Sequence, residues 1–176
     1  VTLIAINLGG GSFGDPVELS VESHDVVDVD ADGDVDLVVP QNYWLQSFLN
    51  DGIGGFTPQP YTDAVTGQIS GLTMADLDAD GLPDAVVPSQ NGTRRTLLRG
   101  TGTGDFDFVS DAMVPGAMSP EIRDLDGDSF LDLVSSGNEN QPYVHVALGL
   151  APFEFGAVQS LATGPVTLAG LRDLDA

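Results

Sequence analysis

The sequence predicts an all-β chain assembled from one repeated sheet, and three observations support this prediction. An Asp-rich segment recurs with its first residue at Asp28, Asp76, Asp124 and Asp173, which gives spacings of 48, 48 and 49 residues. Short apolar runs of β-type residues follow these segments and are separated by Gly, Asn and Asp, which favour turns. No window shows the helical periodicity of apolar residues. Each repeat must therefore stack on its neighbours to bury a core.

The apolar runs recur in phase with the Asp-rich segments. The expected strands include residues 37–39, 86–87, 96–98 and 143–147. A phenylalanine marks a later turn of the unit, at Phe13, Phe56, Phe106 and Phe153. Four strands of about five residues, with their turns, fill a period of this length, which is typical of a blade in a β-propeller.

Both ends of the chain fall inside a repeat. Val1 aligns with the middle of a blade, because Phe13 matches Phe56, and Ala176 falls within the fourth Asp-rich segment. We expect a β-propeller of four-stranded antiparallel blades that is incomplete in this chain, with about three and a half blades. The expected units are a partial blade over residues 1–24, repeats over 25–72, 73–120 and 121–169, and the start of a further repeat over 170–176. The chain is then either part of a longer polypeptide or a protomer that completes its sheets with a neighbour.

The first two Asp-rich segments follow the pattern Asp-x-Asp-x-Asp-Gly-x-x-Asp, the third differs from it at position 6, and the fourth is cut off; the pattern forms an oxygen cage. A tight turn brings the side chains at positions 1, 3 and 5 together, position 7 offers its carbonyl, and position 9 closes the shell. Hard oxygen ligands suit Ca²⁺, whereas Mg²⁺ requires a smaller octahedron and Zn²⁺ prefers nitrogen or sulfur. We predict three full calcium sites and a truncated fourth. The predicted ligands are Asp28, Asp30, Asp32, Asp34 and Asp36; Asp76, Asp78, Asp80, Leu82 and Asp84; Asp124, Asp126, Asp128, Phe130 and Asp132; and Asp173 with Asp175.

Two departures from known loops qualify this prediction. An EF-hand needs a bidentate Glu at position 12, where this chain has Val39, Val87 and Ser135, so the EF-hand interpretation fails. In the third loop Ser129 replaces Gly at position 6, so we expect a left-handed residue or a shifted geometry there. The alternative for any single loop is an Asp-rich turn that only solvates a hairpin, but three copies in register argue against it.

The loops and their spacing resemble the FG-GAP or VCBS repeat family, the calcium-loop blades of integrin-α-like propellers. The resemblance covers nearly the whole chain and includes the pairs Phe13-Gly14 and Phe155-Gly156, although no Gly-Ala-Pro follows. It implies a bladed, extracellular propeller, usually of seven blades. Such a propeller serves adhesion, glycan recognition or as a scaffold beside a separate catalytic domain, and the resemblance implies no reaction.

Composition excludes several classes of partner. The 27 acidic and 5 basic residues give a net charge of −22, which excludes nucleic acid and anionic membranes as electrostatic partners. No apolar run approaches the roughly 18 residues of a membrane span. With 41% hydrophobic residues, the chain is too apolar for an acidic disordered tail, so we expect a folded domain.

A few residues outside the loops are candidates for function. Tyr43 and Trp44 align with Gly92-Thr93 and Glu139-Asn140 in the next two repeats, so the blade itself does not need aromatic residues there. They either stack on a sugar or anchor a partner, or pack locally against a neighbouring loop. Asn91 begins an N-glycosylation sequon.

The basic residues and the histidines leave further alternatives. Arg94, Arg95 and Arg99 either form a solvated surface paired with nearby acids or bind an acidic glycan or the carboxylates of a partner. His24 and His145 fall at unrelated points of the repeat with no paired nucleophile, so we assign no catalytic residue and expect no enzyme.

We therefore expect a calcium-stabilised module for adhesion or assembly, located outside the cell or at its surface. Its expected partners are a protein or a glycan, or further copies of the chain. The alternative is a carbohydrate-binding or polysaccharide-processing propeller with Tyr43 and Trp44 near the site.

Overall fold

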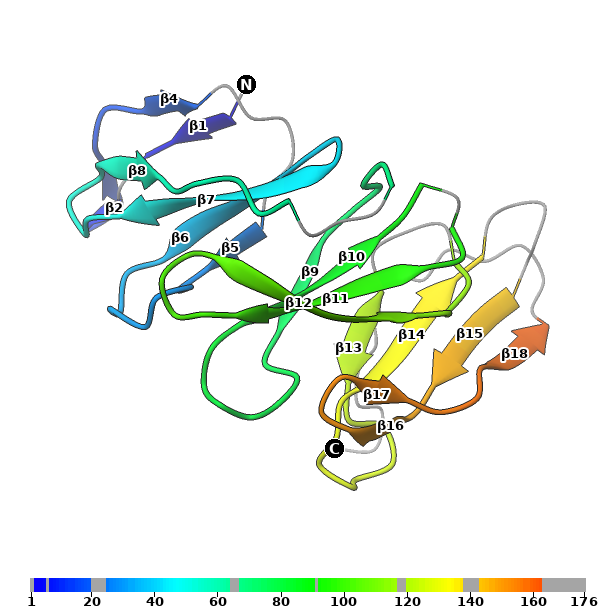
Figure 1. Cartoon of the computed structure of the whole chain (residues 1–176). Helices are drawn as coiled ribbons and strands as arrows, with labels where there is room; N and C mark the ends of the chain where they lie inside the picture. The colour runs from blue at the N-terminus through cyan, green and yellow to red at the C-terminus, as the bar shows by residue number, and fades with distance from the viewer. Residues whose placement is uncertain are drawn as a thin grey trace.

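The computed structural model of the chain describes residues 2–5, 7–19, 25–63, 67–90, 92–116, 120–137 and 143–162. All the regular elements of these residues are β-strands (Figure 1). Three four-stranded antiparallel sheets follow one another along the chain, from the blue end of the colour scale to the orange end. The predicted all-β architecture of four-stranded antiparallel blades is confirmed.

In each four-stranded sheet the strands lie side by side in chain order, and in the third sheet a two-stranded hairpin is inserted before the last strand. The first blade consists of β5 (Asp25–Val27), β6 (Asp36–Gln41), β7 (Trp44–Asn50) and β8 (Phe56–Pro58). The second consists of β9 (Thr73–Ala75), β10 (Asp84–Pro88), β11 (Arg95–Gly100) and β12 (Phe106–Ala112). The third consists of β13 (Glu121–Arg123), β14 (Asp132–Ser136), β15 (Tyr143–Ala147) and β18 (Gln159–Ala162), with the hairpin of β16 (Gly149–Ala151) and β17 (Glu154–Phe155) between β15 and β18.

The N-terminal residues repeat the outer half of the third blade. Strand β1 (Thr2–Ile4) pairs with β4 (Val17–Leu19), and the hairpin between them is formed by β2 (Asn7–Gly9) and β3 (Ser12–Phe13). The third blade has the same arrangement, in which β15 pairs with β18 around the hairpin of β16 and β17. The described part of the chain thus contains three blades and the outer two strands of another, so the propeller is incomplete in this chain.

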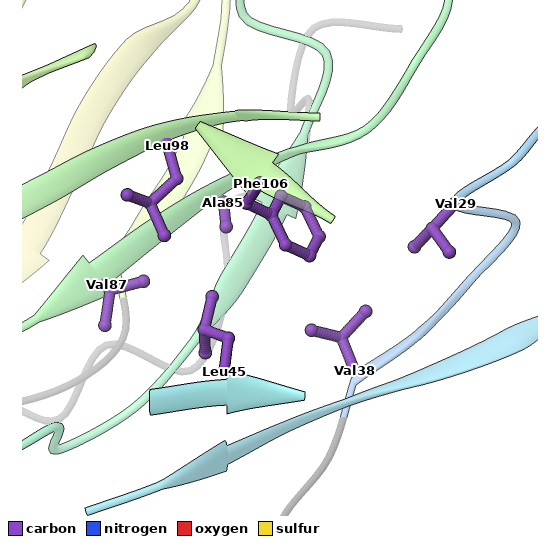
Figure 2. Close-up of a cluster of buried hydrophobic side chains, with 7 residues drawn as sticks. All are labelled: Val29, Val38, Leu45, Ala85, Val87, Leu98 and Phe106. Atoms are coloured by element: carbon purple, nitrogen blue, oxygen red, sulfur yellow. The ribbon is translucent and has the colours of Figure 1, made fainter. Parts of the chain in front are cut away.

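Neighbouring blades pack face to face. Their first strands lie side by side, since β5 contacts β9 and β9 contacts β13. Along β10, Ala85 and Val87 join the core with the first blade, and Val86 joins the core with the third. Because both faces of this strand are covered, it forms one continuous apolar run. Figure 2 shows the core between the first two blades, which consists of Val29, Val38, Leu45, Ala85, Val87, Leu98 and Phe106.

The observed register corrects the alignment of the phenylalanines. Phe13, Phe56 and Phe106 each pair with the residue six positions before them, which is Asn7, Asn50 and Gly100 respectively. In the third blade the residue in this position is Phe155, opposite Gly149, and not Phe153. This hairpin has a register irregularity between Gly149 and Ala151, like the one between Asn7 and Gly9 in the N-terminal hairpin. Phe153 instead lies in the turn with a φ of 58° and packs into the core between the second and third blades.

The register also corrects the alignment of Trp44. Pairing of Pro40 with Leu45, Pro88 with Arg95 and Ser136 with Val144 makes these three pairs equivalent. The residues that precede them, Trp44, Arg94 and Tyr143, are therefore equivalent, whereas the sequence alignment placed Gly92-Thr93 and Glu139-Asn140 there. The connection between the second and third strands is longer in the later blades, and Glu139 and Asn140 lie outside the described residues.

Candidate metal centres

Each Asp-rich loop joins the first strand of a blade to its second strand. In all three loops, one carboxylate oxygen from each of three Asp residues lies within 4.8 Å of the others. Positions 1 and 3 belong to every set, and the third member is position 5 in the first loop and position 9 in the others. The sets are Asp28, Asp30 and Asp32; Asp76, Asp78 and Asp84; and Asp124, Asp126 and Asp132.

The backbone of the loops turns through left-handed residues at positions 4 and 6. In the second loop these are Ala79, with a φ of 58°, and Gly81, with a φ of 90°. In the third loop the second of them is Ser129, with a φ of 76°, so a non-Gly residue adopts the left-handed conformation that the sequence led us to expect. Such a φ is uncommon for a residue with a Cβ. The third loop therefore keeps the geometry of the others at some cost in strain.

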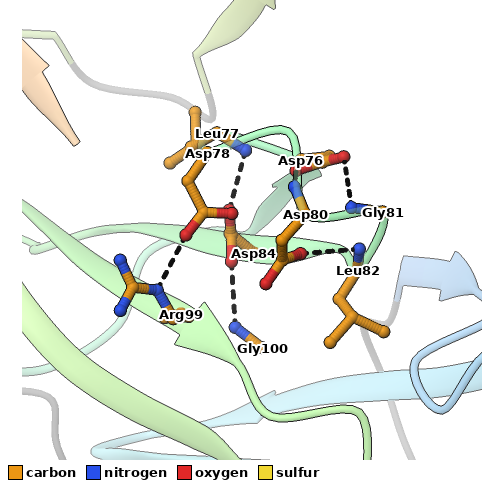
Figure 3. Close-up of polar contacts among 9 residues, drawn as sticks. All are labelled: Asp76, Leu77, Asp78, Asp80, Gly81, Leu82, Asp84, Arg99 and Gly100. Carbon is orange, nitrogen blue, oxygen red and sulfur yellow. Dashed lines mark hydrogen bonds and ion pairs between the residues drawn. The ribbon is translucent and has the colours of Figure 1, made fainter. Parts of the chain in front are cut away.

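Backbone N–H groups orient the carboxylates in the same way in all three loops. In the second loop the Gly81 N–H donates to Asp76 Oδ2 at 3.0 Å, and the Leu82 N–H donates to Asp80 Oδ1 at 2.8 Å (Figure 3). The equivalent bonds join Gly33 to Asp28, Ser129 to Asp124, Asp34 to Asp32 and Phe130 to Asp128. Position 5 is thus held by the loop itself.

The position-9 carboxylate ties the loop to the third strand. Asp84 is fully buried and accepts the Leu77 N–H at 2.7 Å and the Gly100 N–H at 2.9 Å, one on each oxygen. Asp36 and Asp132 make the equivalent pairs of bonds. Sequence reasoning missed this role, because the N–H group of Gly100 lies 16 residues away and carries no side-chain signal.

Burial disfavours the ionised form of two position-9 carboxylates, Asp84 and Asp36. Desolvation raises the pKa of Asp84 to about 6, since the two backbone bonds only partly compensate for it and the charges of Asp78 and Asp80 add to it. Burial also raises the pKa of Asp36. A cation in the loop would act in the opposite direction and favour the ionised carboxylates.

Two orphaned oxygen atoms show that the loops suit a cation. Asp28 Oδ1 and Asp78 Oδ1 are buried and have no hydrogen-bond partner. A buried acceptor without a donor is unfavourable unless something else satisfies its lone pairs. The oxygen-only donor set and these unused lone pairs fit a hard divalent cation such as Ca²⁺.

The second loop also has a built-in cation. Arg99 Nε donates to Asp78 Oδ2 at 2.8 Å (Figure 3), and its guanidinium lies 5.0 Å from the centroid of the Phe153 ring. The equivalent residues of the other blades are Leu49 and Leu148, which precede Asn50 and Gly149. The second loop is therefore less negative than its neighbours before any ion binds.

Other predicted ligands lie outside the three sets. The Asp34 carboxylate lies against Gly52, since a Cβ at Gly52 would clash with it. Asp80 and Asp128 hold the loop backbone, and Leu82 and Phe130 donate their N–H groups to them. Asp173 and Asp175, like His24 and Asn91, lie outside the described residues.

The aromatic candidates form part of a larger group. The rings of Trp44 and Tyr61 have centroids 5.3 Å apart and are tilted by 50°. Backbone bonds between Leu45 and Thr62 bring the two rings together. Trp44, Tyr61 and Tyr43 all remain exposed. Sequence reasoning missed Tyr61, because the segment that contains it is not part of a strand and contacts β7 through the isolated bridge of Thr62 with Leu45.

Two of the three clustered arginines pair with acidic residues, as one alternative from the sequence suggested, and the third pairs with none of the described acids. Arg94 pairs with Asp111 at 3.2 Å, and Arg99 pairs with Asp78, as expected of solvated cations beside acids. Arg95 is instead fully buried. Its position corresponds to that of Leu45 in the first blade, which accounts for the burial.

Within the described ranges, no helix is long and apolar enough to cross a bilayer.

Comparison with known proteins agrees with this architecture. A lectin of Agrocybe aegerita, whose structure is described as the basis of specific recognition of non-reducing terminal N-acetylglucosamine, is similar, with a TM-score of 0.63 and 20% identity. The similarity covers 89% of this chain and 46% of the lectin chain, and at this identity it shows the fold alone. No curated protein matches the chain.

The repeat family is also recognisable in the sequence. Residues 28–87 match the family model described as an FG-GAP-like repeat. This segment begins at the first candidate metal loop, contains the second and ends within β10. The resemblance expected from the sequence is therefore confirmed for this segment, which matches the FG-GAP-like repeat.

Proposed function

We propose that this chain is a non-enzymatic binding module of the extracellular space, in which calcium stabilises each blade. The observation that carries the proposal is the threefold recurrence of one carboxylate arrangement, with the same left-handed turns and the same N–H donors. A single acidic turn has little meaning, but three in register indicate a common ligand. The extracellular location and the role in adhesion or assembly rest on the family resemblance.

The loop residues suggest how an ion would act. Carboxylates at positions 1 and 3 would hold it in every loop, together with Asp32 in the first loop, Asp84 in the second and Asp132 in the third. The ion would supply positive charge to carboxylates that repel one another and that burial disfavours. Since position 9 also bonds to the third strand, a bound ion would couple the loop to three strands of its blade.

A titration of the full chain with calcium tests this proposal. We expect calorimetry to detect three ions per chain, and we expect EGTA to lower the melting temperature. Asp126→Asn should reduce the stoichiometry to two, because Asp126 belongs to the third carboxylate set. Asp15→Asn is the matched control, since Asp15 is also exposed and lies between β3 and β4, outside the three loops. Asp111 would be a poor control, because it bonds to Arg94 and Thr96. A melting temperature that ignores both EGTA and calcium would contradict the proposal.

Carbohydrate binding is the second candidate, and the exposed pair of Trp44 and Tyr61 favours it. Aromatic faces with a polar tip suit a ligand that is apolar on one side and hydrated on the other. The similar fold of a lectin supports the same candidate. Glycan-array binding that Trp44→Ala and Tyr61→Ala abolish, and that Tyr143→Ala leaves intact, would establish it. An array without any bound glycan would count against it.

A further inference from the structure

The interface between the second and third blades contains a buried cation. Arg95 lies two residues before Leu97 on β11, so both side chains point to the same face of the strand. Leu97 packs in the core with Leu133 and Ala147 of the third blade. Arg95 therefore points toward the third blade, and none of its surface is exposed.

Polar residues of the third blade face this arginine. Ser135 and His145 are direct partners across β14 and β15, on the face that Leu133 and Ala147 also use. Ser135 is fully buried, and His145 is 6% exposed. These side chains form a polar row, Arg95, Ser135, His145 and Ser160, and this row is therefore part of the interface between the blades.

Gly116 connects the two sides of this polar region. Its carbonyl accepts Arg95 Nη2 at 2.9 Å. A Cβ on Gly116 would lie 2.6 Å from Ser135 Oγ and 2.8 Å from Arg95 Nη2, so both side chains approach the same point. Arg95, Gly116, Ser135 and His145 thus form one cluster.

The hydrogen bonds of the cluster leave two nitrogen atoms unused. Among the described residues, Arg95 donates to the carbonyls of Arg94 and Gly116, and its Nε has no acceptor. His145 Nδ1 bonds to Ser160 Oγ at 2.9 Å, and its Nε2 has no partner. In the part of the chain that the structure describes, no carboxylate pairs with Arg95; the ion pairs there involve Arg94, Arg99 and Arg123. A buried guanidinium without a counter-charge is strongly unfavourable.

We infer that a small monovalent anion, chloride or a carboxylate of the size of formate, binds between the second and third blades at Arg95 Nε and His145 Nε2. The anion would supply both the missing acceptor and the missing charge. If the Ser160 hydroxyl donates to His145 Nδ1, the neutral imidazole carries its proton on Nε2, where it can donate to the anion. This inference does not depend on the calcium proposal.

The electrostatics of the two groups agree with such a site. Burial lowers the pKa of Arg95 to about 10, which leaves it charged at neutral pH. Burial and the charge of Arg95 lower the pKa of His145, so the imidazole is uncharged at neutral pH. The cluster thus has one net positive charge, which matches one monovalent anion.

Thermal unfolding of the calcium-saturated full chain tests the inference. At constant ionic strength, chloride is exchanged for gluconate, which is too bulky for the interface. The melting temperature should rise by about 3–5 °C for each tenfold increase in chloride above its dissociation constant. A rise with formate but not chloride would still support the site and would identify it as one for carboxylates. Arg95→Leu should remove the dependence, and Arg94→Leu, which deletes the neighbouring cation, should retain it.

Two results would overturn the inference. One is a melting temperature of the wild-type chain that neither chloride nor formate changes. The other is a chloride dependence that survives in Arg95→Leu, because it would then reflect a general salt effect. If Arg95→Leu does not fold, bromide-soaked crystals of the wild-type chain decide the question. An anomalous peak beside the Arg95 guanidinium would support the site, and its absence would refute it.

Discussion

The two interfaces between the three blades share one backbone geometry but differ in chemistry. At the interface of the first and second blades, Leu45 packs with Val87 in a wholly apolar cluster (Figure 2). At the next interface the residue equivalent to Leu45 is Arg95, and the residue equivalent to Val87 is Ser135. Thr96 of the first interface becomes His145 in the second. Three facing positions have therefore changed together from mainly apolar to polar.

This contrast indicates that a blade interface accommodates polar side chains only as a matched set. The rest of the second interface keeps the apolar character of the first, with Val86 and Leu97 packed against Leu133. Burial of a leucine contributes about 1.5–3 kcal/mol, whereas burial of a charge costs several kcal/mol unless partners offset it. Arg95 is therefore stable only together with the groups that face it. Variants that transfer one residue between the interfaces should reveal this dependence.

The largest expected effect comes from Leu45→Arg, which breaks the apolar interface. The new guanidinium would lie among Val38, Val87 and Leu98 with no acceptor, so we expect the chain to lose about 4 kcal/mol or more of its free energy of unfolding. Urea denaturation of the calcium-saturated chain measures the loss. Leu45→Met, which keeps an apolar side chain of similar volume, is the control and should cost less than about 1.5 kcal/mol. Equal stability of the two variants would show that this interface is not closely packed.

A smaller effect is expected when the second interface is converted to the type of the first. Arg95→Leu alone leaves Ser135 and His145 facing an apolar side chain, so it should destabilise the chain. Addition of Ser135→Val and His145→Thr should restore about 1–3 kcal/mol, because the facing positions then match those of the first interface. The energies of the three single variants and the triple variant would give the coupling. Strict additivity of these energies would mean that the three positions do not form a set.

The pH dependence should distinguish the interfaces further, because only the second contains a histidine among these three positions. The pKa of His145 is lower in the folded chain than in the unfolded chain. The unfolded chain therefore binds the proton first as the pH falls below about 6.5, and stability decreases from there down to the folded pKa. His145→Thr should remove this contribution. Urea denaturation between pH 7.5 and 5, with calcium saturating and chloride replaced by gluconate, measures the difference between the wild-type chain and the variant. Identical pH profiles for the two would contradict the burial of His145 against Arg95.

Calcium saturation matters in that experiment because the loops respond in the opposite direction. The raised pKa of Asp84 means that the folded apo chain binds a proton more readily than the unfolded chain. Its contribution would therefore stabilise the apo chain as the pH falls from about 6 toward 4. In EGTA, protonation of Asp84 should therefore raise the free energy of unfolding over part of the pH range in which protonation of His145 lowers it. Asp84→Asn in EGTA should abolish the gain.

Local patterns in the sequence account for much of the fold but little of the interfaces. The period of the Asp-rich loops and the runs at 86–87 and 143–147 predicted the blades, because turn chemistry and strand propensity are local. The left-handed residue at Ser129 followed from the loop pattern in the same way. The burial of Arg95 did not, since it depends on which residues of two blades face each other. Because the connection between the second and third strands differs in length between blades, an alignment of the repeats did not reveal that Arg95 is equivalent to Leu45.

The candidate sites show the same division. The carboxylates that gather in each loop are close in sequence, so their spacing was sufficient to identify them. The bond from Gly100 to Asp84 and the contact of Trp44 with Tyr61 join residues of different strands or connections. Neither carries a spacing signal in a single sequence. Pairing across strands is a property of the fold, and only the structure supplied it.

The smallest expected effect concerns the outer end of the polar row. Ser160 lies on β18 opposite His145 and bonds to its Nδ1, but Ser160 itself is exposed. Because water can replace the lost hydroxyl, Ser160→Ala should cost only about 0.5–1 kcal/mol in the wild-type chain. It should cost nothing in the His145→Thr background, where the imidazole is absent, and a double-mutant cycle measures this coupling. Nitrogen NMR of the imidazole supplies an independent readout, since loss of the hydroxyl should shift the His145 tautomer away from the form protonated at Nε2. The equivalent residue of His145 in the second blade is Thr96, which bonds to Asp111 at 3.0 Å on the neighbouring strand. Asp111→Ala should therefore leave the His145 tautomer unchanged, and a change would mean that the two interfaces communicate through the second blade.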